Sequence, residues 1–258
     1  MVSQQAAPAR PGAVSSVIRL NRRLDPAALA SVFARHGRIH VPQVLDAASA
    51  RAVGQVIASG EVPWTRSVTV NGNPYDVGLP TLAAMPPERV AQFRAAVDEA
   101  ARAGFQYEFD AWRLSDVVEA GERRGGPLAA LEAVYDLVNS EAFLGFVRAM
   151  TGDPHAVYAD AQATRYTAGH FLTAHDDAVE GKNRLFAYVL NFTPVWRADW
   201  GGLLLFHDTD GHVSEGYTPT FNALNIFRVP QAHAVSQVAS FVTASRYSIT
   251  GWIRSRRG

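Results

Sequence analysis

Apolar residues recur at helical spacing through the first 150 or so residues of the chain. Asp25-Pro26 predicts the start of the first helix, because a capping side chain is followed by proline in the first turn, and Gly37 ends that run. A short alternating segment over 38–45 predicts a strand. Further helices are predicted over 47–58, from Pro86-Pro87, from Pro127, and after a capping Ser140.

From about residue 155 the pattern changes to short apolar runs separated by turns. Runs of this kind are AVYADAQATRY, RLFAYVLNFT, GLLLFH, HVSEGY, ALNIFRV, HAVSQV and RYSITGWI. So many short strands close together predict a closed or two-sheet β structure. The helical part is too irregular to stand alone, so we expect one domain over 16–258. In it, a helical support region (16–154) packs on a β core (155–258), and 1–15 form a loose tail.

Composition narrows the possible functions. With 48% hydrophobic residues in 258, the chain can bury a sizeable core. Lys+Arg and Asp+Glu are both 24, so net charge supplies no attraction to nucleic acid or an anionic membrane. The absence of cysteine excludes disulfides, cysteine-bound zinc, iron–sulfur centres and thiol catalysis. Without a signal-peptide pattern or a long apolar run, we expect a cytoplasmic protein with neither nucleic acid nor membrane as partner; its oligomeric state stays open.

The spacing of His175 and Asp177 separates them from the other histidines and acids. Two residues apart on an extended segment, their side chains point to the same side and can converge on one ion. His233, at the start of a later predicted strand, is the candidate third ligand. Two imidazoles and one carboxylate form the facial set of non-haem Fe(II) oxygenases. Arg246, on the following predicted strand, can bind a dicarboxylate in bidentate fashion.

Six short motifs extend this pattern over roughly residues 155–254. They are Tyr166-x-x-Gly169-x-Phe171-Leu172-x-x-His175-Asp176-Asp177, Tyr188-Val189-Leu190-Asn191, Trp200-Gly201-Gly202-Leu203-Leu204-Leu205-Phe206, Asn225-x-Phe227, His233-x-Val235-x-x-Val238 and Arg246-x-Ser248-Ile249-x-Gly251-Trp252. Together they resemble the prolyl-4-hydroxylase-type 2-oxoglutarate/Fe(II) oxygenases. Within that superfamily the chain is most similar to the branch that hydroxylates a proline of a small-subunit ribosomal protein.

The resemblance implies a fold, cofactors and an activity. The implied fold is α+β, mainly β: a double-stranded β-helix (a cupin-like jelly roll) with N-terminal helices packed on the barrel. Fe(II) would be held by His175, Asp177 and His233. Arg246 would pair with the distal carboxylate of 2-oxoglutarate, and the Tyr166 hydroxyl would support it. O₂ is the other co-substrate, and ascorbate (vitamin C) is a further candidate cofactor. The implied enzyme is a dioxygenase that hydroxylates an unactivated C–H bond, here a prolyl residue of a protein or peptide.

One position departs from the pattern of these relatives. They often carry a second co-substrate tyrosine immediately before the Leu-Asn pair, where this chain has Val189. Tyr188 is one residue out of register, so we expect it to face the other side of its strand. This departure bears on the affinity for 2-oxoglutarate or on its exact pose.

Several residues near the motifs have simpler expected roles. We expect Asp176 to point away from the ligands, and His170 to lie at the surface or the cavity mouth. His207 and His212 flank a predicted hairpin tip, and Gly201-Gly202 permits close packing at the barrel wall. The segments 61–83 and 121–126 are candidate substrate-covering segments, although ordinary surface connection is the favoured interpretation for both.

Three other functions fit parts of the pattern. The substrate can be a free amino acid or another small metabolite instead of a peptide. The chain can also be a non-catalytic β-barrel binding module with a relic metal site, or a cupin-like isomerase that does not use 2-oxoglutarate. Arg246 and Tyr166 favour the oxygenase over the last two. The cavity mouth separates the substrates, because an open groove suits a peptide and a closed pocket suits a small molecule.

Overall fold

A computed structural model describes residues 17–70 and 72–256, so the expected loose tail at 1–15 lies outside the described residues. The strands are β1 (Arg38–Pro42), β2 (Thr65–Val70), β3 (Asn73–Gly78), β4 (Tyr107–Trp112), β5 (Tyr158–Ala159), β6 (Gln162–Tyr166), β7 (Phe171–His175), β8 (Arg184–Asn191), β9 (Leu204–His207), β10 (Val213–Tyr217), β11 (Ala223–Arg228), β12 (His233–Val235) and β13 (Arg246–Arg254). The helices are α1 (Pro26–His36), α2 (Ala47–Ile57), α3 (Leu79–Ala83), α4 (Pro87–Ala103), α5 (Leu114–Glu119), α6 (Ala129–Val138) and α7 (Glu141–Thr151), with 3₁₀ turns η1 (Gly126–Leu128) and η2 (Ala198–Trp200).

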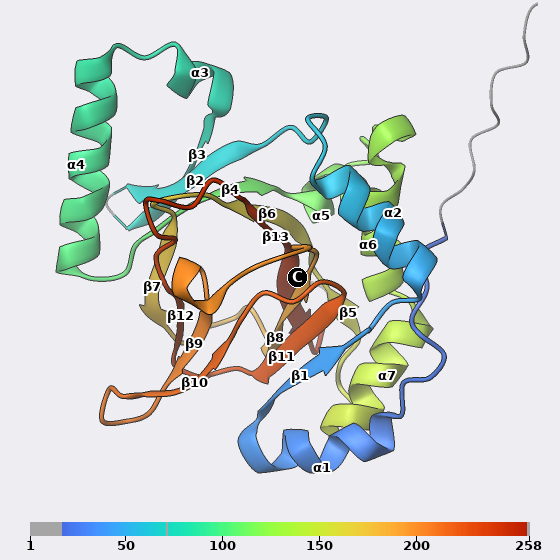
Figure 1. The fold of residues 1–258 in the computed structure, drawn as a ribbon. Coiled ribbons are helices and arrows are strands. Elements are labelled where there is room, and N and C mark those ends of the chain that lie inside the picture. Colours follow the sequence, from blue (N-terminus) through green and yellow to red (C-terminus); the bar gives the residue numbers. More distant parts are fainter. Residues whose placement is uncertain (1–16, 71, 257–258) are drawn as a thin grey trace, which may run out of the picture.

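Strands β6 to β13 form a jelly roll (Figure 1). One half has the order β6-β13-β8-β11 and the other the order β7-β12-β9-β10. Every pair in both halves is antiparallel. The alternating hydrophobicity of the C-terminal part thus closes into a barrel with an inner and an outer face. The predicted jelly-roll core is confirmed.

The sheet also includes four strands from the part of the chain that we expected to be mainly helical. β1 pairs with β11, and β4 lies between β6 and β7, where it joins the two halves. β2 pairs with β4, and β3 completes a hairpin with β2. Strand β2 and the second half of β4 are hard to predict from sequence because charged residues stand at buried positions. Arg66 Nε lies 2.7 Å from Asp110 Oδ1, and Arg165 Nη2 lies 2.7 Å from Asp110 Oδ2, so these charges are buried as partners.

Helices α1, α2, α6 and α7 cover the outer face of the half that contains β8 and β13 (Figure 1). The predicted ends of α1 are confirmed: Asp25 accepts hydrogen bonds from two N–H groups of the first turn, and Gly37 ends the helix at φ 65°. Ser140 likewise caps α7 through the N–H of Phe143. The main apolar core fills the space between these helices and the sheet. This packing leaves the inner face of the barrel free for a cavity.

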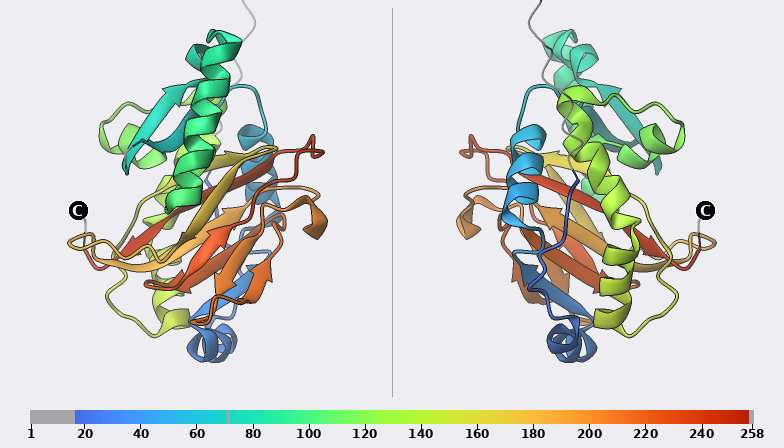
Figure 2. Two further views of the ribbon diagram at one scale, coloured as in Figure 1. Left: turned by 90° about the vertical axis from the view of Figure 1, so that its left-hand side faces the viewer. Right: turned by 90° about the vertical axis from the view of Figure 1, so that its right-hand side faces the viewer.

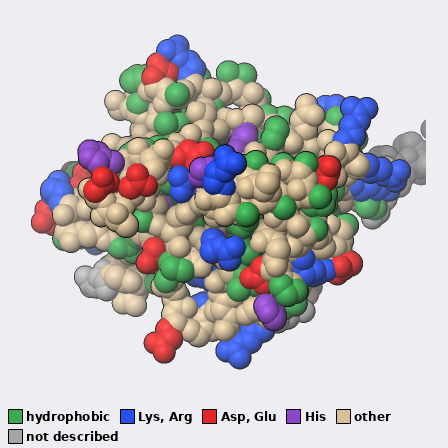
Figure 3. Space-filling view, turned by 90° about the horizontal axis from the view of Figure 1, so that it is seen from below, with side chains coloured by type: hydrophobic (Ala, Val, Ile, Leu, Met, Phe, Trp, Pro, Cys, Tyr) green, Lys and Arg blue, Asp and Glu red, His purple; other side chains and the backbone are tan. Residues whose placement is uncertain are grey.

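Helix α4 and the β2–β3 hairpin stand on another side of the barrel (Figure 2). Val97 of α4 packs against Val68 of β2 and Phe171 of β7 in a small separate core. The helix begins at Pro87, close to the expected start. None of the helices in the described part of the chain has the length and apolar character of a transmembrane span. Acidic and basic side chains are interspersed over the face seen in Figure 3.

Candidate active site

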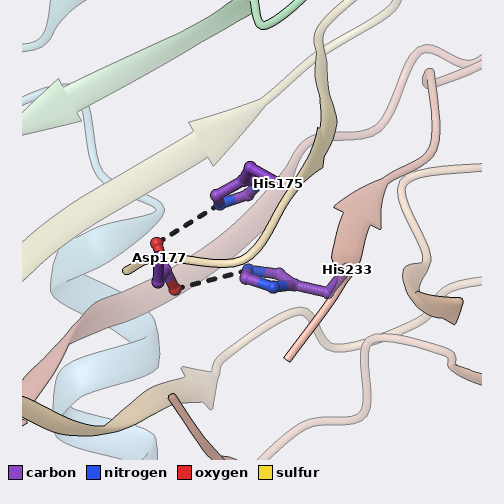
Figure 4. A group of neighbouring side chains, drawn as sticks. All are labelled: His175, Asp177 and His233. Carbon is purple, nitrogen blue, oxygen red and sulfur yellow. Dashed lines mark ion pairs between the residues drawn. The ribbon is translucent and has the colours of Figure 1, made fainter. Parts of the chain in front are cut away.

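The three predicted metal ligands meet inside the jelly roll (Figure 4). His175 ends β7 and His233 begins β12, and the two residues pair directly across these strands. Asp177 Oδ1 lies 3.3 Å from His175 Nε2, and its Oδ2 lies 3.4 Å from His233 Nε2. One ligand atom from each residue lies within 4.8 Å of the others. Three donors at this separation can reach a single ion.

Backbone carbonyls fix the orientation of both imidazoles. His175 Nδ1 lies 3.0 Å from the Thr173 carbonyl, and His233 Nδ1 lies 2.8 Å from the Gln231 carbonyl. A carbonyl only accepts, so each Nδ1 carries the proton and donates it. In the neutral form of either ring, Nε2 therefore presents its lone pair to the shared space. Burial, reinforced by the neighbouring His175, lowers the pKa of His233 to about 4, which keeps its ring neutral at physiological pH.

Asp177 reaches the cluster in a different way from the one the sequence predicts. β7 ends at His175, and Asp177 adopts a left-handed backbone with φ 64°, so the chain turns instead of continuing as a strand. The expected convergence is present, but the turn produces it. Burial opposes ionisation of Asp177, yet His175 and His233 outweigh burial and lower the pKa of this carboxyl. Asp176 is exposed, as expected, and accepts a hydrogen bond from the Ala178 N–H at 3.0 Å.

A cavity of about 720 Å³ contains the cluster and extends to Arg246 and Tyr166. These two residues face each other across β13 and β6. Arg246 is 2% exposed, and its Nε and Nη1 have no hydrogen-bond partner within the described residues. Its guanidinium lies 5.0 Å from the centre of the Tyr166 ring. Burial lowers the pKa of Arg246 from a very high ordinary value. A buried cation without a partner is costly, so an anion bound in the cavity would stabilise it.

The wall beside this cation matches the expected departure from the relatives. Val189 lines the cavity and packs with Leu204 and Phe227. Tyr188 is fully buried on the opposite face of β8, where its ring packs against Phe143 with centroids 6.0 Å apart. Its hydroxyl donates to the Asp160 carbonyl at 2.8 Å. The predicted register is confirmed, and position 189 offers no hydroxyl to a ligand.

The expectation for His170 is wrong. It is 2% exposed instead of lying at the surface, and the Thr167 N–H donates to its Nδ1 at 3.2 Å. Burial, followed by the charge of Arg66, lowers its pKa to about 4. The physical reason is a tight turn through Gly169 at φ 87°, which is held down when the Val238 N–H donates to the His170 carbonyl. This contact joins segments far apart in the sequence.

The other residues near the motifs, which we expected to have simple structural roles, lie largely as expected. His207 and His212 flank the β9–β10 hairpin, with His207 half-buried and His212 exposed. Gly201 allows a close approach, since a Cβ there would lie 2.0 Å from the Gln237 carbonyl oxygen. Of the two candidate covering segments, 61–83 brings Ser67 and Pro74 of the β2–β3 hairpin to the cavity lining. The loop 121–126 is instead fastened to α6, where the Glu132 carboxylate accepts two of its backbone N–H groups.

An aromatic wall in the cavity is missing from our sequence interpretation. Phe105, Tyr107 and Phe109 follow one another along one side of β4 and its approach, with ring centroids 5.8 Å and 5.2 Å apart. Phe109 stacks on Tyr166 at 5.1 Å, and the half-exposed Phe105 lies 5.2 Å from the His175 ring. The alternation of aromatics in FQYEF could have revealed this strand. Arg184 and Trp252, which also line the cavity, have no role in that interpretation either.

Part of the chain is similar in sequence to known oxygenases. Residues 161–254, which contain all five predicted site residues, match the sequence model of the 2OG-Fe(II) oxygenase superfamily. By sequence, this part of the chain is similar to the 2OG-Fe(II) oxygenase superfamily. Over 119 residues the chain is 34% identical to "Prolyl 3-hydroxylase OGFOD1" of Mus musculus. That alignment covers 43% of this chain and 21% of the mouse protein, so the chain matches about a fifth of its curated relative's length.

Solved structures share the fold over most of the chain. A 2OG-Fe(II) oxygenase family oxidoreductase from Burkholderia pseudomallei has a TM-score of 0.57 at 16% identity, covering 93% of this chain and 95% of that one. A prolyl-4-hydroxylase from Pseudomonas putida has a TM-score of 0.55 at 17% identity, covering 91% and 100%. A prolyl hydroxylase from Trichoplax adhaerens, solved with a hypoxia inducible factor peptide fragment, has a TM-score of 0.58 at 15% identity, covering 89% of both chains. At these identities the likeness concerns the fold.

Proposed function

We propose that the protein is a 2-oxoglutarate- and Fe(II)-dependent dioxygenase that hydroxylates a prolyl residue of a protein or peptide. One observation carries the proposal. Two imidazoles and a carboxylate converge in the same cavity as Arg246, a buried cation with unpaired donors. Each half of this arrangement is incomplete by itself. A metal ion completes the first half, and a dicarboxylate completes the second.

The donor set fits Fe(II). His175 and His233 offer Nε2 lone pairs, and Asp177 offers a carboxylate whose lowered pKa keeps it ionised. A two-histidine, one-carboxylate set leaves open positions for a co-substrate and O₂. When bound, Fe(II) together with 2-oxoglutarate and O₂ supplies the oxidising power that breaks an unactivated C–H bond. The residues of the chain supply position and a dry environment.

Arg246 and Tyr166 anchor the co-substrate in this proposal. The planar guanidinium can donate two parallel hydrogen bonds to the distal carboxylate of 2-oxoglutarate. Because Arg246 is already buried and unpaired, the protein pays its desolvation before the ligand arrives. Val189, Leu204 and Phe227 line the adjoining wall and exclude water. Orientation of the keto acid therefore comes from one fixed end and a shaped apolar wall.

The cavity suits a substrate side chain in addition to the co-substrate. Its volume of about 720 Å³ lies in the upper part of the range of ordinary ligand sites. Phe105 and Val179, each 50% exposed, give its lining an apolar, accessible edge, which suits a segment of another protein. The similar mouse protein is a prolyl 3-hydroxylase, and the Trichoplax neighbour was solved with a peptide fragment. These points favour a peptidyl proline over a free amino acid.

The proposal includes three finer statements. Ascorbate is included as a reductant that keeps the iron ferrous, and the enzyme is placed in the cytoplasm. Residues 16–258 are taken as one oxygenase domain. The last statement is supported by β1 and β4, which belong to the N-terminal half of the chain but pair with strands of the jelly roll.

The test presents the protein with Fe(II), 2-oxoglutarate, ascorbate and O₂, and with either a panel of proline-containing peptides or free amino acids. We expect some peptides to gain the mass of one oxygen atom, with one succinate formed for each product. Tandem mass spectrometry then identifies the modified residue. Oxidation of free amino acids alone would replace the peptide by a small molecule. No 2-oxoglutarate turnover with any substrate, by folded protein loaded with iron, would contradict the dioxygenase itself.

A further inference from the structure

Asp177 has a left-handed backbone conformation, which is unfavourable for a residue other than glycine. Its φ of 64° lies in the left-handed region, which a non-glycine residue adopts only at some cost, although aspartate tolerates it better than most. Both carboxylate oxygens face histidine nitrogens, at 3.3 Å and 3.4 Å. A shift of this backbone would move the carboxylate away from the imidazoles. Other contacts must therefore hold the turn in place.

Arg184, the first residue of β8, makes the contact that holds this turn. Its Nη1 donates to the backbone carbonyl of Asp177 at 2.9 Å and lies 4.0 Å from Oδ1 of the same residue. One cation thus binds the backbone of the metal-ligand candidate and lies at ion-pair distance from its side chain. The Arg184 side chain is only 13% exposed, so solvent screens this contact weakly.

Trp252 fixes Arg184 from the other side. The guanidinium carbon lies 3.5 Å from the centre of the Trp252 ring, a close stacking distance for a cation on an aromatic face. Trp252 is on β13, which pairs with β8, so the two side chains rest on neighbouring strands. The Trp252 indole N–H is buried beside the cavity and makes no close hydrogen bond within the described residues, but it helps to lower the pKa of the Asp177 carboxyl. The ring therefore clamps the arginine against the Asp177 turn.

We propose that Arg184, clamped on Trp252, is a positioning residue that holds the left-handed turn of Asp177 and aims its carboxylate at His175 and His233. This inference rests on the proposed function, because it concerns the same metal site. The planar guanidinium suits the role, since it can stack on an indole and donate sideways at the same time. A lysine offers a point charge without the flat face.

The test measures metal affinity instead of turnover. Mn(II) is titrated into the metal-free protein and followed by electron paramagnetic resonance, which reports the free ion. Loss of partners behind a metal ligand typically weakens metal binding by about 10- to 100-fold. We expect Arg184→Ala to raise the Kd for Mn(II) by about 10-fold or more. We expect Arg184→Lys to fold and still bind more weakly than the wild type, so it carries the test if the alanine variant does not fold.

Arg228→Ala is the matched control. Arg228 also lies over aromatic rings, 5.7 Å from the Phe33 centroid and 5.5 Å from the Phe186 centroid, but it is exposed and outside the cavity lining. We expect this variant to bind Mn(II) as the wild type does. Because it also loses an arginine–ring contact, it corrects for any general effect of that loss on stability.

A double-variant cycle tests the clamp. Trp252→Ala removes the surface on which Arg184 rests, so we expect it to raise the Kd as Arg184→Ala does. If both substitutions act through the Arg184–Trp252 contact, the double variant should bind Mn(II) no more weakly than whichever single variant has the higher Kd. Independent, multiplying effects would overturn the clamp.

Failure of this inference is distinguishable from failure of the proposed function. If the wild-type protein binds no Mn(II), or if His233→Ala binds it equally well, the metal site itself is wrong. If the wild type binds Mn(II) through His233 but Arg184→Ala and Arg184→Lys bind it with unchanged Kd, only the positioning role is wrong. A raised KM for the substrate in those two variants, with unchanged metal affinity, would instead assign Arg184 to the substrate.

Discussion

Strands β8 and β13 each have one face that packs against the helices and one that faces the cavity. The helix-facing residues contribute to stability, and the cavity-facing residues include those that we assign to ligand binding. The residues facing the helices are Phe186, Tyr188, Leu190, Tyr247, Ile249 and Ile253. Those facing the cavity include Ala187, Val189, Arg246, Thr250 and Trp252. Tyr188 carries a buried hydroxyl on the helix-facing side, and it is hydrogen-bonded to a carbonyl.

The cavity-facing side leaves polar groups unpaired. Two guanidinium nitrogens of Arg246 have no hydrogen-bond partner within the described residues. Buried polar groups in folded proteins are almost always paired, so such exceptions mark places where a ligand completes the structure. One face of each strand is thus selected for packing and the other for binding. The predictions that follow test this separation.

The largest expected effect is on the metal site. His233→Ala removes one of three ligands from the cavity face, so we expect 2-oxoglutarate turnover to fall to background while thermal unfolding remains cooperative. Succinate formation and circular dichroism check the two parts. His212→Ala changes an exposed histidine outside the cavity lining and should keep full activity. Residual turnover by His233→Ala near the wild-type rate would remove His233 from the ligand set.

The helix face should respond in the opposite way. Phe143 of α7 is fully buried and packs on Tyr188. Phe143→Ala should lower the free energy of unfolding by about 3–5 kcal/mol, through lost burial and the cavity left behind. Urea denaturation measures this loss. The KM for 2-oxoglutarate of the folded fraction should stay unchanged, and a large change in KM would mean that the two faces are coupled.

His170 adds a pH dependence to the stability of the barrel interior. Its folded pKa of about 4 lies below the ordinary value of 6.5, so between these values the unfolded chain binds a proton that the folded chain does not. The free energy of unfolding should therefore fall by about 3 kcal/mol as the pH drops from 6.5 to 4. Arg66 and Arg165 disfavour the protonated ring, and Asp110 favours it.

The control for this pH effect is His170→Gln, which keeps an acceptor for the Thr167 N–H but does not titrate. The difference between the wild type and this variant isolates His170, because buried His233 contributes in the same direction to both proteins. Denaturant midpoints at several pH values provide the measurement. Parallel pH profiles would show that His170 takes up its proton equally in both states.

The smallest expected effect concerns Arg246. Arg246→Met keeps much of the volume but removes the charge that the distal carboxylate would meet. We expect the KM for 2-oxoglutarate to rise by about 30-fold, equivalent to about 2 kcal/mol for charged hydrogen bonds. The unfolding free energy of the ligand-free protein should not fall, since a buried unpaired cation is removed. If Arg246→Met were destabilised and had a normal KM for 2-oxoglutarate, Arg246 would have a structural role instead of a binding role.

Local signals in the sequence were sufficient for much of the fold. Asp25 and Gly37 bound α1 because capping chemistry acts within one turn, and Ser140 starts α7 for the same reason. The motifs after residue 155 were sufficient for the jelly roll. Strand β4 was missed although its aromatic residues alternate, and strand β2 was missed because Arg66 looks like a surface charge until its partner Asp110 across the sheet is known. That pairing joins residues 44 apart in the chain.

The geometry of the candidate active site also depends on contacts between residues far apart in the sequence. His175, Asp177 and His233 could be selected from residue type and spacing, but the left-handed turn of Asp177 could not. That turn is held by Arg184, which looks like an ordinary charge at the start of a strand. The burial of His170 likewise depends on Val238, a residue from a distant loop. Sequence identifies groups that carry chemistry, whereas contacts between distant segments decide how they are oriented.

The most direct test of the central claim is an absorption spectrum recorded without oxygen. Fe(II) is added to the metal-free protein, and 2-oxoglutarate is then titrated in. We predict a visible charge-transfer band that saturates at one equivalent of iron, needs a higher concentration of 2-oxoglutarate in Arg246→Met, and is absent in His233→Ala. A folded protein that binds iron but gives no band, or an undiminished band in His233→Ala, would contradict a single iron site beside a 2-oxoglutarate anchor.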